Sequence, residues 1–220
     1  HMPQSILAET ELKNLAAIPF QMISPANNAP IIGIFQDSML GSYRFTRPNV
    51  TFTPREAMNL LMRYSNIDVN KLRENGDKIS NFDILSQILP PITIKRKTKL
   101  YNEDEDYSTS NNILEIRNGN YIRGQMEKSV LGSTTNGIIH RICNDYGNMR
   151  ATEHIDDMQN IITEYMKNSA FSVGISDLIA DRKTQDSIIQ AILTQKQEVQ
   201  SIIEKIHLGI FENNTSTTNM

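Results

Sequence analysis

The spacing of apolar residues changes its period twice along this chain of 220 residues. Residues 8–18 and 81–89 carry apolar side chains at helical spacing, which predicts short amphipathic helices, the second stopped by Pro90-Pro91. Over residues 92–131 the period becomes that of strands, and after Gly137 it returns to that of helices. Helices, strands and helices in this order, without regular β-α-β alternation, predict an α+β fold with short antiparallel strands and a long final helix.

Two segments before residue 65 carry sharper local signals. Thr53-Pro54-Arg55-Glu56 predicts a helix start, with a threonine cap, a proline at the first helical position and a glutamate that completes a capping box. The apolar run Ile31–Phe35 predicts a buried strand closed by Gln36-Asp37, and Gly41 predicts a further turn. The residues expected on the inner face of the helix after Thr53 are Met58, Leu60, Leu61 and Tyr64.

A hairpin is predicted where Asn118-Gly119 separates two apolar runs, because both residues tolerate the positive φ of a tight turn. The acidic stretch Glu103–Asp106 before it predicts an exposed loop. The basic run Lys95-Arg96-Lys97, with Lys99, is expected to be a solvated strand end, with pairing across the acidic loop as the alternative. Later helices are predicted over residues 140–146, 152–168 and 184–208. The polar tail 212–220 is expected to be disordered.

Composition excludes some classes of protein. A net charge of −3 argues against a free-standing nucleic-acid binder, which usually carries a basic surface. The single cysteine, Cys143, allows no internal disulfide and favours a reducing, intracellular compartment. No apolar run is long enough for a membrane helix, so no membrane association is expected.

The titratable residues form no convincing catalytic or metal-binding pattern. His140 and Cys143 have a helical spacing, but the remaining histidines complete no set of four zinc ligands. The acids of Glu103–Asp106 are expected to be a solvated loop, and Asp177 and Asp181 are expected to cap helices. No Ser-His-Asp or Cys-His arrangement is supported, so we predict no catalytic residue and no metal site.

Four strings in order resemble the largest subunit of multisubunit DNA-directed RNA polymerases, in the eukaryotic and large-DNA-virus branch more than the bacterial one. Each combines turn residues with an apolar run, and together they span nearly the whole chain. They are His1-Met2-Pro3-Gln4 followed by Ala17-Ile18-Pro19-Phe20-Gln21-Met22-Ile23-Ser24-Pro25, then Pro30-Ile31-Ile32-Gly33-Ile34-Phe35-Gln36-Asp37-Ser38-Met39-Leu40-Gly41, Gly132-Ser133-Thr134-Thr135-Asn136-Gly137-Ile138-Ile139-His140, and Phe171-Ser172-Val173-Gly174-Ile175-Ser176-Asp177-Leu178-Ile179-Ala180-Asp181.

The resemblance implies a division of the chain and a reaction. Residues 1–24 would end the active-site domain, 25–182 would form the pore domain, 183–211 the first funnel helix and 212–220 a disordered tail. The family transfers nucleotides with Mg²⁺ held by three closely spaced aspartates, which would lie immediately before His1. This chain lacks them, so we expect it to hold no cofactor and to be inactive alone, while its parent protein is an enzyme.

The resemblance also implies candidate site residues. Lys128, in Glu127-Lys128-Ser129 where relatives have Glu-Lys-Lys, would face the nucleotide-entry pore together with Asn136 and Gly137. A surface lysine at the end of a strand is the equally simple alternative for Lys128. Gln36 and Asp37 would cap backbone groups at a strand end and support the catalytic aspartates from behind.

The function implied is that of a wall of the pore through which nucleotides enter and backtracked RNA leaves. Its partners would be the other polymerase subunits, the second-largest first, with DNA, RNA and nucleoside triphosphates reached through the parent and a transcript-cleavage factor at the funnel. The location would be the nucleus, or a cytoplasmic virus factory or virion. The alternative is an independent module or regulator that binds polymerase; an Asp-Phe-Asp-Gly-Asp string encoded upstream of His1 would exclude it.

Overall fold

The computed structural model describes residues 2–74 and 76–210, which divide into two units, residues 1–170 and 171–220. The predicted tail 212–220 lies outside the described residues. The domain boundaries implied by the resemblance, at 24 and 182, stay predictions. Among the described residues no helix is both long enough and apolar enough to span a membrane.

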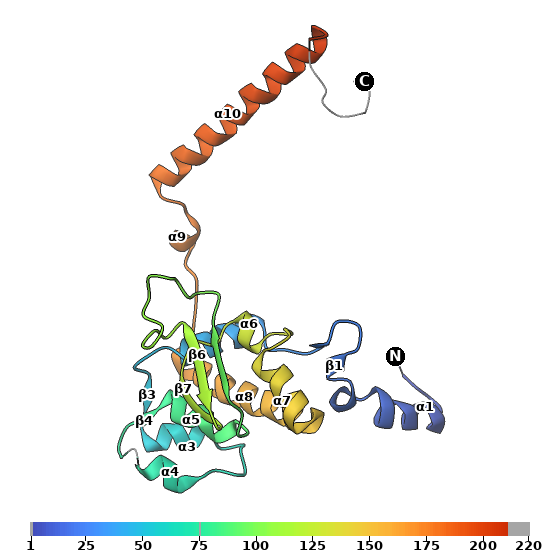
Figure 1. Cartoon of the computed structure of the whole chain (residues 1–220), viewed down its shortest axis with the longest axis vertical. Helices are drawn as coiled ribbons and strands as arrows, with labels where there is room; N and C mark the ends of the chain where they lie inside the picture. Colours follow the sequence, from blue (N-terminus) through green and yellow to red (C-terminus); the bar gives the residue numbers. More distant parts are fainter. Residues whose placement is uncertain (1, 75, 211–220) are drawn as a thin grey trace. The chain divides into compact units, whose positions relative to one another are not determined.

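The first unit mixes helices with short antiparallel strands, which confirms the α+β prediction (Figure 1). Its helical elements are α1 (Ile6–Glu11), a π-helical turn (Leu12–Ala16), a 3-10 turn (Ile18–Phe20), α2 (Gln36–Phe45), α3 (Pro54–Leu60), α4 (Val69–Glu74), α5 (Asn81–Ile88), α6 (Lys128–Leu131), α7 (Ile138–Tyr146) and α8 (Asn148–Ser169). Its strands are β1 (Ile23–Ser24), β2 (Ala29–Pro30), β3 (Thr51–Phe52), β4 (Ile79–Ser80), β5 (Ile94–Lys97), β6 (Ile113–Arg117) and β7 (Asn120–Arg123).

Helix α8 is the centre of the first unit. It packs against α7, α2, α3 and α5, and α5 in turn packs against strand β7 of the sheet. Met158, Ile161 and Ile162 of α8 are almost fully buried, as are Ile84 and Leu85 of α5. These side chains belong to one continuous core, which holds the sheet and the helices as a single body.

The sheet β5-β6-β7 contains the predicted hairpin. Ile94 pairs with Ile116 across β5 and β6, and Ile116 pairs with Tyr121 across β6 and β7. Asn118 and Gly119 both have positive φ, 46° and 77°, which confirms the turn expected from their residue types. The capping box at Thr53 is also confirmed, since Thr53 and Glu56 bond each other's backbone N–H groups.

Three predictions before residue 65 are wrong, two of them because distant contacts override the local pattern. Residues 31–35 form no strand: the Ile34 N–H donates to the Leu131 carbonyl at 3.0 Å, an isolated bond rather than a ladder, and Gln36 begins α2. Gly41 is no turn but lies buried inside α2, where a Cβ would come within 2.5 Å of Ile162 Cγ2. Met58 points outward, with 71% of its surface exposed, whereas Leu60 and Leu61 are buried as expected.

The basic run lies on strand β5 with Lys95 and Lys97 exposed, as expected for a solvated strand end, and its lysines contact tyrosine rings rather than the acids of the loop. Lys95 lies over the Tyr107 ring and Lys97 over the Tyr101 ring, with 5.0 and 4.7 Å between ammonium and ring centroid. Lys95 also lies 3.6 Å from the buried carboxylate of Glu115 on the neighbouring strand. The lysines thus contact the tyrosines that flank the loop instead of its acidic side chains. A lysine stem can pack on a ring face while its charged end stays near solvent.

The second unit consists of α9 (Ile175–Leu178) and α10 (Arg182–His207). Asp177 accepts from the Gly174 N–H at 2.8 Å, and Asp181 accepts from the Thr184 N–H at 3.3 Å. Both aspartates therefore cap helices, as predicted. None of the described residues from 171 to 210 is buried.

Candidate functional site: the turn before helix α7

Lys128 is the first residue of α6 and is exposed. It does not end a strand, because Gly124 turns the chain away from β7 first. Gly124 has a φ of +116°, and a Cβ there would lie 2.5 Å from the Leu114 Cα, so only glycine fits this close approach to β6. The chain then forms the short helix that carries the Lys128 ammonium at the surface.

The turn Gly132–Gly137 follows α6 and packs against the segment that leads into α2. A Cβ on Gly33 would lie 2.5 Å from the Ser133 nitrogen, and Ile34 bonds the Leu131 carbonyl. Two segments about a hundred residues apart in sequence therefore touch backbone to backbone. The start of α2, with Gln36 and Asp37, follows this contact directly in the sequence.

The three pore candidates differ in exposure. Asn136 is exposed with a φ of +64°, and its carbonyl accepts from Arg96 Nη1 at 2.8 Å. Gly137 is buried and is the N-cap residue of α7; a Cβ there would lie 2.9 Å from the Val130 carbonyl oxygen. Side chains can therefore reach solvent at Lys128 and Asn136, while Gly137 shapes the backbone.

Gln36 and Asp37 occupy the first turn of α2, and both are exposed. Gln36 has a φ of +54°, which is uncommon for a residue with a side chain. The expected role at a strand end is therefore wrong in its structural part. Their support of catalytic aspartates stays a prediction.

A polar hollow of about 300 Å³ lies beside the turn, between β5 and the first turns of α7. It is lined by Thr93, Ile94, Lys95, Arg96, Asn136, His140, Arg141 and Asn144. Arg141 Nε is 3.3 Å from the Asp145 carboxylate, and the His140 ring is 7% exposed. The sequence reasoning missed this hollow; the only signals were Arg96 within the basic run and the spacing of residues 140, 141 and 144 along one helix face.

The acidic loop does not fit a magnesium site. Glu105 accepts from Ser110 and Asn112, and Asp106 accepts from Ser108, so the loop's own donors hold these carboxylates and keep their pKa values below the usual range. Within residues 2–74 and 76–210 no three His, Cys, Asp or Glu side chains gather in a way that could hold a metal ion.

Cys143 belongs to the core, and His140 is buried and hydrogen-bonded beside the polar hollow. Cys143 is 6% exposed, and burial raises the pKa of its thiol, which disfavours the reactive thiolate. His140 Nδ1 lies 3.4 Å from the Asn136 N–H and from Asn144 Nδ2. The prediction of a hydrogen-bonded histidine and a core cysteine is confirmed.

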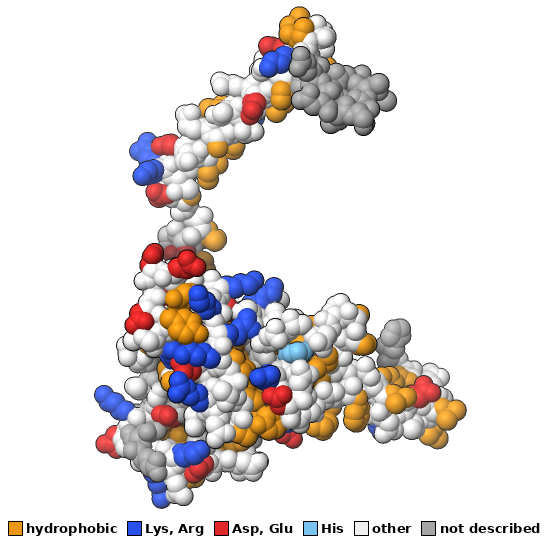
Figure 2. Space-filling model, in the orientation of Figure 1, with side chains coloured by type: hydrophobic (Ala, Val, Ile, Leu, Met, Phe, Trp, Pro, Cys, Tyr) orange, Lys and Arg blue, Asp and Glu red, His pale blue; other side chains and the backbone are white. Residues whose placement is uncertain are grey.

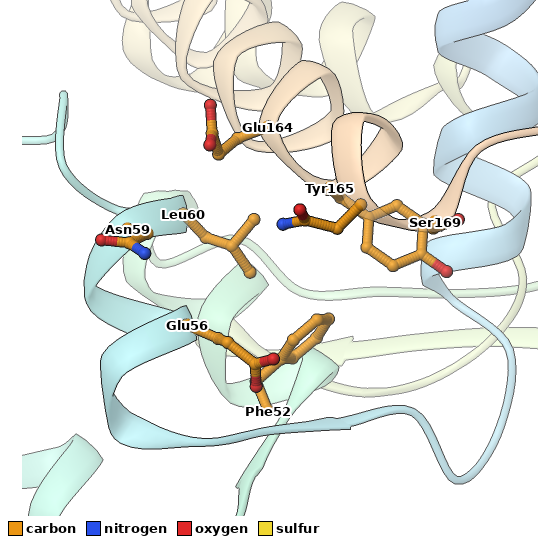
Figure 3. Close-up of a pocket in the computed structure, with 8 residues that line it drawn as sticks. Phe52, Glu56, Asn59, Leu60, Glu164, Tyr165 and Ser169 are labelled. Carbon is orange, nitrogen blue, oxygen red and sulfur yellow. The ribbon is translucent and has the colours of Figure 1, made fainter.

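A second, smaller cleft of about 170 Å³ lies between α3 and the end of α8 (Figure 3). Glu56 points toward it but is held by the Thr53 N–H at 2.8 Å, which is the main cause that lowers the pKa of its carboxyl. Tyr165 packs edge-on against Phe45, with ring centroids 5.1 Å apart. Glu56 thus belongs to the capping box of α3, and Tyr165 packs against the core, so both side chains have structural roles.

An apolar hollow of about 720 Å³ lies over α3 and α4. Its wall includes Met58 and Met62, 71% and 73% exposed, and the partly exposed Ile67 and Leu72. The first residues of the chain expose further large apolar side chains, such as Ile6 at 82% and Leu7 at 79%. Apolar surface of this extent is typical of a protein that packs against others.

Comparison with known proteins identifies the family to which this chain is similar. The family described as RNA polymerase Rpb1, domain 3, matches residues 21–178. The DNA-directed RNA polymerase II subunits RPB1-A and RPB1-B of Trypanosoma brucei brucei are each 27% identical over 205 residues, covering 92% of this chain and 11% of the relative. DNA-directed RNA polymerase subunit 1 of Acanthamoeba polyphaga mimivirus is 31% identical over 203 residues, covering 92% of this chain and 13% of the relative.

This chain thus spans about a tenth of the length of the curated relatives it matches. The matched range contains all the candidate residues at 36–37 and 128–137. The chain belongs to the RNA polymerase Rpb1, domain 3, family, and its relatives carry this region within the largest subunit of DNA-directed RNA polymerase.

Proposed function

We propose that this chain forms a wall of the nucleotide-entry pore in the largest subunit of a DNA-directed RNA polymerase. The observation that carries the proposal is the backbone contact of Gly33 with Gly132 and Ser133. It gathers into one surface the two segments that the resemblance assigns to the active-centre side. Lys128 and Asn136, which lie before and after Gly132-Ser133 in the sequence, are both exposed, so their side chains are available to passing ligands.

The uncovered apolar surfaces support a role inside a larger assembly. The hollow over α3 and α4 and the exposed side chains of α1 each form a contiguous apolar surface rather than isolated apolar residues. Isoleucines and methionines are prominent in these surfaces. Other polymerase subunits, the second-largest first, are the partners that would cover them. The exposed α10 would begin the funnel, where a transcript-cleavage factor would dock.

The parent would transfer nucleotides from nucleoside triphosphates to RNA on a DNA template, with Mg²⁺ supplied by residues outside this chain. The contribution of this chain would be to shape and charge the path to that centre. Relatives from a trypanosome and a giant virus fit a polymerase of the nucleus or of a virus factory or virion.

Lys128 gives the test. Its exposed ammonium would attract triphosphates over several ångströms rather than hold them, so it would act on encounter and weaken with salt. In the assembled polymerase, Lys128→Ala should raise the apparent KM for nucleotides or alter the stability of backtracked complexes, with single-turnover chemistry nearly unchanged. The effect should shrink as ionic strength rises.

Lys78→Ala is the matched control, because Lys78 is also an exposed lysine but lies outside the candidate surface. Equal behaviour of the two variants would overturn the pore role of Lys128. A large loss of chemistry at saturating nucleotide would overturn it too, since that result requires a contact made in the transition state.

The second candidate, an independent module that binds polymerase, predicts a different assembly. Such a module would associate reversibly with a complete polymerase, whereas a wall segment is part of the largest subunit itself. Purification of the native polymerase with mass analysis of its largest subunit distinguishes the two. A separate 25-kDa polypeptide would favour the module.

A further inference from the structure

The polar hollow between β5 and α7 is surrounded by hydrogen-bond donors. Arg96 reaches it from the strand and Arg141 from the helix, while Asn136 and Asn144 add amide groups. Figure 2 shows Lys and Arg side chains gathered on the face of the first unit that carries the three-stranded sheet. The hollow therefore combines positive charge with neutral donors.

Both arginines keep donors for a ligand. Arg96 uses Nη1 on the Asn136 carbonyl at 2.8 Å, a bond that fixes the guanidinium beside the turn. Arg141 uses Nε on Asp145 at 3.3 Å. A guanidinium has further N–H donors in a planar fork, and such a fork matches the oxygens of a phosphate. Asp145 offsets the charge of Arg141, and Lys95 is shared with Glu115, so Arg96 is the cation that leaves the hollow positive.

His140 adds a buried donor. Its Nδ1 faces two donors, the Asn136 N–H and the Asn144 amide, each at 3.4 Å, so this nitrogen accepts and the proton resides on Nε2. Among the described residues Nε2 has no hydrogen-bond partner, although it is buried. An unmade bond at a buried donor is unfavourable, and because His140 lines the hollow, a ligand oxygen that reached Nε2 would satisfy it.

We propose that this hollow binds the phosphate tail of a nucleoside polyphosphate, held by Arg96 and Arg141 with Asn136, Asn144 and His140. The volume of about 300 Å³ is at the lower end for ligand sites and suits a short chain of phosphates better than a polymer. The site does not depend on the pore role of Lys128, which does not line the hollow.

Calorimetric titration of the 220-residue chain with tripolyphosphate and with ATP, both free of divalent metal, tests the proposal. Arg96→Gln and Arg141→Gln should each weaken binding about ten-fold, because each removes a charge-assisted hydrogen bond. Arg55→Gln is the matched control, since Arg55 is exposed on α3 away from the hollow, and it should leave the affinity within about two-fold. Circular dichroism melts establish that each variant is folded.

A resonance of the His140 ring should shift on addition of tripolyphosphate in the unchanged chain and not in Arg96→Gln. Equal loss in Arg55→Gln, or no measurable binding by any variant including the unchanged chain, would overturn the site. If a short single-stranded RNA bound more tightly than tripolyphosphate, and lost this binding in Arg96→Gln and Arg141→Gln, the ligand would be a nucleic-acid backbone and not a nucleotide. Lys128→Ala should leave this binding unchanged, so failure here is distinct from failure of the pore role.

Discussion

Helices α8 and α10 are both long, amphipathic and rich in isoleucine, yet only α8 is covered. In α8, Met158, Ile161 and Ile162 are almost fully buried under α2, α3 and α7. In α10, the stripe of Ile188, Ile192, Val199, Ile203 and Ile206 stays between 43% and 53% exposed. The comparison teaches that apolar periodicity determines a helix and its inner face, whereas burial depends on what other segments supply.

The largest expected difference between the two regions comes from one substitution made in each. Ile84→Ala removes a side chain with no exposure and should lower the free energy of unfolding of the first unit by about 2–5 kcal/mol. Ile192→Ala removes one that is 49% exposed and should change that value by less than about 0.5 kcal/mol. All seven tyrosines lie within residues 1–170, so tyrosine fluorescence in urea reports this unit alone.

Equal effects of the two isoleucine substitutions would contradict this account, because they would mean that α10 contributes to the stability of the first unit. Ile189→Ala, at 53% exposure, provides a second surface control.

The next effect concerns His154, which is 1% exposed in α8. Burial lowers its pKa to about 4, against the smaller opposing effect of the Ile88 carbonyl. His154 therefore stays neutral in the folded protein down to about pH 4, whereas in the unfolded chain it takes up a proton below about pH 6.5. Stability is therefore complete above pH 6.5 and falls by up to about 1.4 kcal/mol per pH unit as the pH drops toward 4.

His154→Leu should flatten this dependence between pH 7 and 5, measured by tyrosine fluorescence in urea at each pH. The range stays above the window in which Glu115, whose pKa is lowered chiefly by Arg123, would lose its charge. An unchanged pH slope in His154→Leu would assign the dependence to other groups. No histidine of α10 should affect it, since His207 belongs to the second unit.

The features that could be predicted from the sequence depend on interactions within a few residues. The capping box of Thr53 and Glu56 and the Asn118-Gly119 turn are complete in their own segments. The caps at Asp177 and Asp181 are equally local. Residue type alone therefore suffices to predict them.

The errors at Gly41 and at residues 31–35, and the missed polar hollow, involve partners that are distant in sequence. Gly41 has the residue type of a turn, but its lack of a side chain admits Ile162 of α8 instead. Residues 31–35 have the apolar run of a strand, but their backbone meets the turn after Leu131. The polar hollow needs Arg96 and Arg141 to meet across β5 and α7, which no local pattern encodes.

A smaller effect is expected at the contact of α2 with α8. A Cβ at position 41 would lie 2.5 Å from Ile162 Cγ2 and 2.9 Å from Met166 Cγ. Gly41→Ala should therefore destabilise the first unit by about 1–3 kcal/mol, although alanine favours a helix. In Met166→Ala, which opens space at this contact, Gly41→Ala should cost less; an equal cost in both backgrounds would place the strain elsewhere.

The smallest effect again uses a matched pair, the caps of α3 and α10. Thr53 Oγ1 accepts from the Glu56 N–H at 3.4 Å, and Asp181 accepts from the Thr184 N–H at 3.3 Å, so the two bonds are alike. Thr53→Ala should lower the stability of the first unit by about 1 kcal/mol, because α3 packs on α8 and its start is part of the cooperative fold. Asp181→Ala should leave the urea midpoint of the tyrosine fluorescence unchanged. It should reduce only the helical circular dichroism signal of α10, because α10 is expected to unfold independently of the core of the first unit. A shift of the tyrosine fluorescence midpoint in Asp181→Ala would mean that the two units unfold together. The buried helix α8 and the exposed helix α10 would then differ in burial but not in how they unfold.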